Sequence, residues 1–351
     1  MIELKIGKPS FGFLPYESHI EGILTGNNLN KIDYYLSMLD MEAICLQYGN
    51  KRIYDFFIGR NIQCNNIYRE YSSRIDLSSE EALIPFLVDA LAKGSFCYLS
   101  VDTFCINKYI SYKKEHIVHS PLVSGIDLDR NLIKISDFFD FTNYGIVWVP
   151  INEFIKGYFA IQKVVEEGDI EETENWILKI EKINICKNKT EICDRMAINK
   201  VFKGYVLGSE EVKNSMDTFS YINYRLANHK VFQKQSIVEQ NLSVTGIKVY
   251  EYLKLYIEES IKEPQVLMRI KNLVLLKKHF DVYKKIVQVL GINSEKVQAC
   301  IEKAQLFLLI GMKINRSNQI NNKLYFDMIS IVRELKELES NSGFLKDNSK
   351  I

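Results

Sequence analysis

The first half of the chain combines short extended runs with one clearly marked helix. Apolar residues alternate with polar ones, or form short continuous runs, over residues 96–101, 122–126 and 132–135. A polar, turn-forming sequence at residues 127–131 joins the last two runs, which predicts an antiparallel hairpin. Earlier, a serine and two acidic residues open an apolar segment at residues 78–91. This opening predicts a capped helix that ends before a glycine.

Weaker patterns lie on both sides of this region. Residues 16–24 and 32–47 carry apolar residues at helical spacing, which predicts two further helices. After the hairpin, residues 145–150 and 158–161 have the character of strands, with a short helical link predicted at residues 151–154. The first half therefore favours an α+β arrangement.

From about residue 190 the apolar positions follow the period of a helix. They recur at this spacing in four segments, at residues 247–261, 266–290, 294–310 and 323–338. Almost no glycine, proline or strand-like alternation interrupts them. We interpret the apolar stripe that includes Leu267 and Phe280 as a core seam rather than a cofactor site.

These patterns divide the chain into three parts. We expect an α+β domain at residues 1–190, an all-α helical domain at residues 191–338 and a flexible tail at residues 339–351. A chain of 351 residues with 47% apolar content can bury a core of the size that two domains need.

Composition excludes some partner classes. The 45 basic and 44 acidic residues give a net charge of +1, so no global field attracts nucleic acid or an anionic membrane. The N-terminal sequence lacks the pattern of a signal peptide, and no apolar run approaches the ~20 residues of a membrane span. We therefore expect a cytoplasmic protein that binds neither nucleic acid nor membrane.

The seven cysteines predict reduced thiols rather than disulfides or a metal site. They are scattered and odd in number, and no CxxC pair occurs. The closest groupings, Cys97 with Cys105 and Cys186 with Cys193, have no further ligands at zinc spacing. His116 and His119 stand three residues apart, which leaves a two-histidine metal site as an alternative.

Two residues around the predicted hairpin could carry out proton chemistry together. His119 opens its first strand and Asp137 ends its second. Because these positions are neighbours in an antiparallel hairpin, the imidazole and the carboxylate can come within hydrogen-bonding distance. Such a pair is half of a catalytic triad, although a purely structural hydrogen bond explains the same pattern.

The order of segments resembles a family of papain-fold, cysteine-peptidase-like proteins from natural-product gene clusters, that of the butirosin-biosynthesis acyltransferase. The motifs that carry the resemblance are Gly94 to Asp102, His116-Ile-Val-His119 before Gly125-Ile-Asp127, Ile133-Lys-Ile-Ser-Asp137-Phe-Phe, and more loosely Val244 to Leu253. The resemblance implies a papain-like (C39-peptidase-like) α+β domain with an antiparallel sheet, followed by the helical domain.

The resemblance also implies a cysteine, a histidine and an acid in that chain order. The histidine corresponds to His119 and the acid to Asp137. The cysteine should stand at a helix N-terminus, where the dipole and free N–H groups activate a thiolate and form an oxyanion hole. That position falls on Ser18, or one residue later on His19, so no cysteine is present there.

Several interpretations of the nucleophile position remain open. Ser18 can act as a weaker nucleophile that depends on its base, or it can be a helix cap. Cys45 and Cys64 also lie in the first third of the chain, and both fit inert thiols better than nucleophiles.

The resemblance leads to three hypotheses about function. The first is an acyltransferase that moves an acyl group from a carrier-protein thioester to a small-molecule amine in secondary-metabolite (nonribosomal, thiotemplated) biosynthesis, without a cofactor or metal. Ser18, His119 and Asp137 would be its catalytic residues. The second is a catalytically impaired papain-fold scaffold or binding protein of a biosynthetic assembly. The third is a peptide hydrolase. The aromatic helical surface suggests a homodimer.

Overall fold

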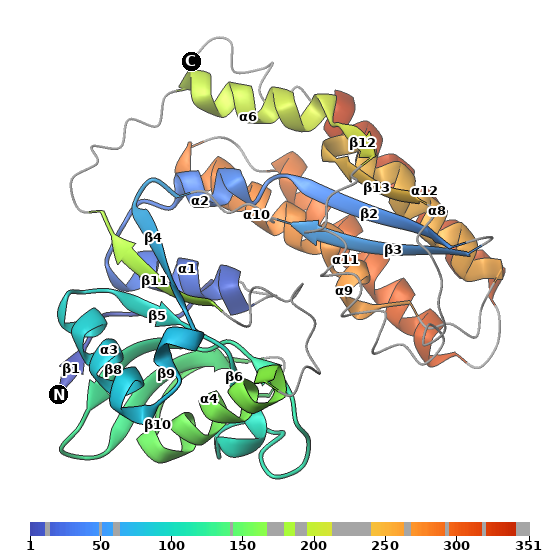
Figure 1. Cartoon of the computed structure of the whole chain (residues 1–351). Helices are drawn as coiled ribbons and strands as arrows, with labels where there is room; N and C mark the ends of the chain where they lie inside the picture. The colour runs from blue at the N-terminus through green and yellow to red at the C-terminus, as the bar shows by residue number, and fades with distance from the viewer. Residues whose placement is uncertain are drawn as a thin grey trace. The chain divides into compact units, whose positions relative to one another are not determined.

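The computed structural model shows a mixed α/β protein with antiparallel sheets and with helices gathered in the C-terminal part (Figure 1). It describes residues 1–10, 15–48, 51–58, 64–140, 143–166, 179–186, 195–212, 240–262, 268–291, 295–317 and 321–341. Within these residues, no helix has the length and apolar character needed to cross a membrane.

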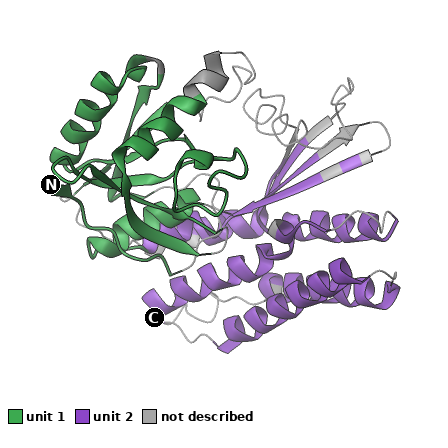
Figure 2. Cartoon of the chain, turned by 90° about the horizontal axis from the view of Figure 1, so that it is seen from below, with its two compact units in different colours: residues 1–31, 64–191, 216–230 green, residues 32–63, 192–215, 231–351 purple. Residues whose placement is uncertain are grey.

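The chain forms two compact units, coloured separately in Figure 2. Unit 1 holds the described residues within 1–31 and 64–191, and unit 2 holds those within 32–63, 192–215 and 231–351. The change of unit after residue 191 lies next to the predicted boundary. Residues 32–63, which we expected in the first domain, belong to unit 2.

Unit 1 is built on one antiparallel sheet. Its strands are, in spatial order, β10 (Tyr144–Pro150), β9 (Leu132–Phe138), β8 (Leu122–Asp127), β5 (Phe96–Tyr98), β11 (Lys179–Ile185) and β4 (Ile67–Ser73), and β1 (Ile2–Glu3) also pairs with β8. A separate two-stranded pairing joins β6 (Val101–Asp102) to β7 (Val118–His119). All six residues of β8 are buried, which places this strand in the centre of the core.

The hairpin of β8 and β9 confirms the prediction from the turn sequence. The Asp127 side chain accepts a hydrogen bond from the backbone N–H of Arg130 at 3.2 Å. Asn131 closes the turn at a φ of 56°, a left-handed conformation that asparagine tolerates better than most residues. The short polar sequence thus fixes the pairing of Asp127 with Leu132, and from it the register as far as Gly125, where the pairing shifts.

Two helices of unit 1 flank the sheet near the candidate site. Helix α1 (Pro15–Gly26) contacts β9, and helix α3 (Glu80–Ala92) packs on β5 and β8. Helix α3 begins as predicted at a serine, because the Ser79 hydroxyl accepts a hydrogen bond from the N–H of Ala82. It ends before Gly94, whose φ is +85°.

The prediction of a strand at residues 158–161 is wrong. Those residues lie in helix α4 (Ile151–Glu166), which packs on β6. The buried side chains of Phe154, Tyr158 and Ile161 follow each other at intervals of four and three, which is the spacing of one helix face. A four-residue window was too short to reveal this period.

Unit 2 combines a four-stranded antiparallel sheet with helices, so the prediction of an all-α second half is wrong. The sheet order is β12 (Glu210–Val212), β13 (Gln240–Thr245), β2 (Met41–Tyr48) and β3 (Lys51–Ile58). The helix predicted at residues 32–47 ends early, as α2 (Ile32–Ser37), and the rest is β2. Since residues 41–45 are all buried, their apolar pattern fits a buried strand as well as a helix.

The helices predicted in the second half are confirmed within a few residues. They are α8 (Val249–Lys262), α9 (Ile270–Leu273), α10 (Leu275–Val289), α11 (Glu295–Arg316) and α12 (Asn322–Asn341), and α6 (Arg195–Leu207) precedes them. Helix α12 continues into the predicted flexible tail, where Glu339 is buried. Residues 342–351 of that tail lie outside the described residues.

Candidate functional site

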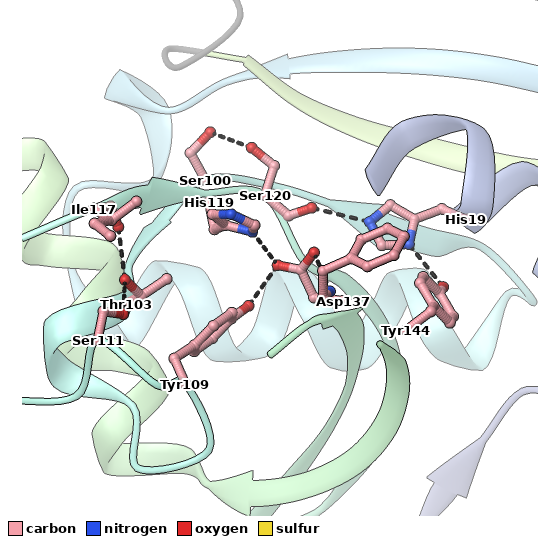
Figure 3. A network of polar contacts seen from close by, with 11 residues as sticks. His19, Ser100, Thr103, Tyr109, Ser111, Ile117, His119, Ser120, Asp137 and Tyr144 are labelled. Carbon is pink, nitrogen blue, oxygen red and sulfur yellow. Dashed lines mark hydrogen bonds and ion pairs between the residues drawn. The ribbon is translucent and has the colours of Figure 1, made fainter. Parts of the chain in front are cut away.

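The structure brings His119 and Asp137 together, as the hairpin predicts (Figure 3). His119 ends β7, three residues before β8 begins, and Asp137 is the next-to-last residue of β9. The Nδ1 atom of His119 lies 2.9 Å from Oδ2 of Asp137. The His119 side chain is 18% exposed and that of Asp137 is completely buried. One end of the pair therefore reaches solvent and the other is anchored in the core.

Asp137 is surrounded by hydrogen-bond donors. Its Oδ2 atom receives the Nδ1–H of His119 and also the hydroxyl of Tyr109, at 2.6 Å. Its Oδ1 atom accepts the backbone N–H of Phe138 at 2.8 Å. A buried carboxylate is stable only when its oxygens are paired in this way. These three donors compensate the burial of the Asp137 carboxylate.

The carboxylate determines the tautomer of His119. Since an ionised carboxylate only accepts hydrogen bonds, the shared hydrogen is on Nδ1, and Nε2 of the neutral ring carries a lone pair. Burial alone would lower the pKa of His119, but the hydrogen bond that the ring donates to Asp137, together with the negative charge of that carboxylate, outweighs burial and raises it. The ring thus takes up a proton at Nε2 more readily than a free imidazole does.

A second imidazole, that of His19, lies on α1 beside the same pair. It is completely buried, and its Nε2 is 3.0 Å from the carbonyl oxygen of Ser120. Because a carbonyl only accepts, Nε2 carries the hydrogen and Nδ1 accepts from the Tyr144 hydroxyl at 2.8 Å. Burial lowers the pKa of His19 to about 4, so the ring is neutral at pH 7. Figure 3 shows the His19 ring with its hydrogen bonds to Ser120 and Tyr144.

The structure does not join Ser18 to this pair. Helix α1 begins at Pro15, so Ser18 is its fourth residue and is not the cap that precedes a helix. Its side chain is completely buried. Among the described residues, the hydrogen bond of His119 goes to Asp137, and no serine or cysteine bonds to its other ring nitrogen. The helical N–H of His19 points to the carbonyl of Pro15, which leaves it unable to serve an oxyanion.

Cys45 and Cys64, the other two candidates for the nucleophile, are buried. Cys45 lies on β2 instead of in the predicted helix, and burial raises the pKa of its thiol to about 11. An activated cysteine needs a lowered pKa and access to solvent, so the environment of Cys45 fits an inert thiol.

His116 belongs to a second histidine–carboxylate pair. Its Nδ1 lies 2.6 Å from Oδ2 of Asp102, and its ring stacks on Phe104 at 4.2 Å between centroids. The two histidines at 116 and 119 thus bind different carboxylates. In the described part of the chain, no three metal-binding side chains cluster.

Sequence reasoning missed Tyr109, Tyr144 and the buried serine pair. The hydroxyls of Ser100 and Ser120 lie 2.9 Å apart next to His119 (Figure 3). Tyr109 stands in a loop without periodicity, so no local pattern marks it. His19 entered the prediction only as a neighbour of Ser18, and nothing in the sequence indicated its burial.

Comparison with known proteins adds no relative to this picture. No family model and no curated protein matches the chain. The motifs of the sequence and the geometry around His119 are therefore the observations that support a function.

Proposed function

We propose that this chain is an acyltransferase in which His119 is the general base and Asp137 holds its ring. The substrate class follows from the family resemblance: an acyl thioester on a carrier protein as donor and a small amine as acceptor. The observation that carries the proposal is the 2.9 Å contact between His119 Nδ1 and a fully buried carboxylate. Because Nδ1 binds the carboxylate, Nε2 is the nitrogen of His119 that can accept a proton.

The environment of residue 18 supports direct transfer without an acyl-enzyme. Ser18 is completely buried, as the fourth residue of helix α1. In direct transfer, the acceptor amine attacks the thioester carbon while His119 Nε2 takes a proton from the amine nitrogen. The tetrahedral intermediate then breaks its C–S bond, and the leaving thiolate receives that proton. The products are an amide and a free thiol, and Asp137 holds the orientation of the imidazole throughout.

A second candidate is a scaffold or binding protein of the papain-like class. The serine at the expected cysteine position favours it, since Ser18 has a hydroxyl where the family has a thiol. In this case the His119–Asp137 pair is a structural hydrogen bond between β7 and β9. The two candidates differ in whether His119 affects chemistry.

Product analysis separates the candidates. The full chain is incubated with acyl-pantetheine thioesters and a panel of amines, and amide and free thiol are measured by liquid chromatography and mass spectrometry. We expect His119→Gln to reduce amide formation at least 100-fold, since general-base catalysis contributes about 10²–10⁴-fold. His116→Gln is the matched control, because His116 bonds a different carboxylate, and it should keep the activity.

Ser18→Ala distinguishes direct transfer from an acyl-enzyme. Direct transfer predicts that this variant remains active and that intact-protein mass spectrometry detects no acyl adduct on the native chain. Folded protein that forms no amide with any thioester would favour the scaffold. Amide formation that is equally fast in His119→Gln would refute the role of His119 as general base.

A further inference from the structure

A tyrosine from outside the sheet shares the carboxylate oxygen that holds His119. Tyr109 is 5% exposed, and its hydroxyl donates to Oδ2 of Asp137 at 2.6 Å, the same atom that accepts the Nδ1–H of His119. The rings of Tyr109 and His119 also meet edge to face, with centroids 5.8 Å apart. Figure 3 shows both side chains pointing at this one oxygen.

The loop that carries Tyr109 is held by hydrogen bonds at several points. The backbone N–H of Ile110 donates to the carbonyl of Phe139 at 2.9 Å, and the Tyr109 ring lies on that of Phe139. At the base of the loop, the N–H of Thr103 donates to Ile117 at 3.0 Å. Such a loop can hold a side chain in one position as a strand does.

We propose that Tyr109 is a positioning residue of the site, because its hydroxyl shares Asp137 Oδ2 with the imidazole of His119 and so weakens the hold of the carboxylate on the ring. This inference rests on the proposed function, since it assigns a role in setting the state of the base. A neutral donor spreads the charge of the oxygen it binds, so less of that charge is available to stabilise a protonated ring.

Other titratable groups surround the pair and must be held constant in a test. They are His19 from α1, Tyr98 from β5, Tyr144 from β10, and Asp102 with His116 beside β7. His19 is neutral at pH 7, and burial raises the pKa values of Tyr98 and Tyr144, so these three do not change charge near neutral pH. Asp137 is thus the charge that Tyr109 modulates.

Removal of the Tyr109 hydroxyl should strengthen the hold on protonated His119. In Tyr109→Phe the carboxylate loses one donor, and we expect the pKa of His119 to rise by about one unit. The measurement is a ring-proton or ¹³C NMR titration of His119, assigned by comparison with His119→Gln. Tyr112→Phe is the matched control, since Tyr112 lies in the same loop and its ring faces Lys113. It should leave the titration unchanged.

The result that overturns the inference is a His119 titration that is the same in Tyr109→Phe and in the native chain. If Tyr109→Phe does not fold, the Tyr109 hydroxyl proton of the native chain gives the answer. Its resonance should lie at low field and shift as His119 titrates, and a shift that stays constant through that titration refutes the inference.

The titration needs no substrate, so its failure differs from that of the proposed function. A raised His119 pKa in Tyr109→Phe without any amide formation would refute the acyltransferase and leave the positioning role intact. Amide formation with an unaltered titration would refute only the role of Tyr109. Where both hold, the rate of Tyr109→Phe should reach half its maximum at a higher pH than that of the native chain.

Discussion

His19 and His119 are two imidazoles in one site whose pKa values are shifted in opposite directions. His119 reaches solvent and shares a proton with a carboxylate, which raises its pKa. His19 is completely buried between a tyrosine hydroxyl and a carbonyl, and burial lowers its pKa to about 4. At neutral pH the first is suited to exchange protons, and the second is suited to hold α1 against β10 without a charge.

The lowered pKa of His19 predicts a loss of stability in mild acid. The unfolded chain protonates this histidine below about pH 6.5, whereas the native chain does not do so above about pH 4. Its contribution is therefore complete above pH 6.5 and is lost as the pH falls through this window, by about 3 kcal/mol in total. Urea unfolding gives the free energy of unfolding at each pH. Between pH 7 and pH 4 it should fall by this amount more in the native chain than in His19→Asn, whose side chain cannot titrate. An equal fall in both chains would contradict the assignment.

At the scale of single residues, only part of the site could be predicted. Asp137 lies in strand β9 of the hairpin, and His119 lies in β7, three residues before the hairpin begins, so the turn sequence was sufficient to indicate that the two are close. Tyr109 and His19 reach the pair through tertiary contacts of a loop and of a helix, and no local pattern indicates such contacts. The prediction of Ser18 as a cap was wrong because α1 starts three residues earlier.

At the scale of elements, the predictions that rested on local interactions succeeded. The hairpin of β8 and β9 and the start of α3 depend on side chains within three residues of each other. Strand β2 depends instead on pairing with β13, far later in the chain, and an apolar pattern cannot indicate that partner. Local periodicity therefore assigned a helix to residues 41–47.

The cap of α3 gives a quantitative test at this scale. The Ser79 hydroxyl accepts the N–H of Ala82 at 3.3 Å, so Ser79→Ala should lower the free energy of unfolding by about 1 kcal/mol. Ser78→Ala changes the neighbouring exposed serine, which precedes the cap, and should leave stability within about 0.5 kcal/mol of the native value. Chemical denaturation of both variants makes the comparison. Equal effects would show that the cap bond contributes nothing.

At the scale of the whole molecule, unit 2 contains a buried polar cluster that the apolar pattern of the sequence did not predict. Tyr205 on α6 and His279 on α10 both bind Glu339 on α12, at 2.8 Å and 2.7 Å. These three residues are widely separated in the sequence, and Glu339 fell in the predicted flexible tail. The cluster links three helices through one carboxylate.

Loss of this carboxylate should weaken unit 2. Glu339→Ala removes the carboxylate from the buried Tyr205 hydroxyl and His279 ring and leaves them only their mutual contact at 3.2 Å, which we expect to cost about 2–3 kcal/mol. Hydrogen exchange followed by mass spectrometry should show faster exchange in α6, α10 and α12. Glu337→Ala, at an exposed position of the same helix, is the control and should exchange as the native chain does. Unchanged protection in Glu339→Ala would contradict the role of the cluster.

In the proposed reaction, neutral His119 accepts the proton of the acceptor amine. The pH dependence of amide formation tests this role. The acceptor should be an aromatic amine, which loses its own proton well below the range of interest. Because the pKa of His119 is raised, the rate should increase with pH through a midpoint above about 6.5 that equals the NMR titration midpoint of His119. A rate that is independent of pH across this titration, or a profile that persists in His119→Gln, would contradict the claim.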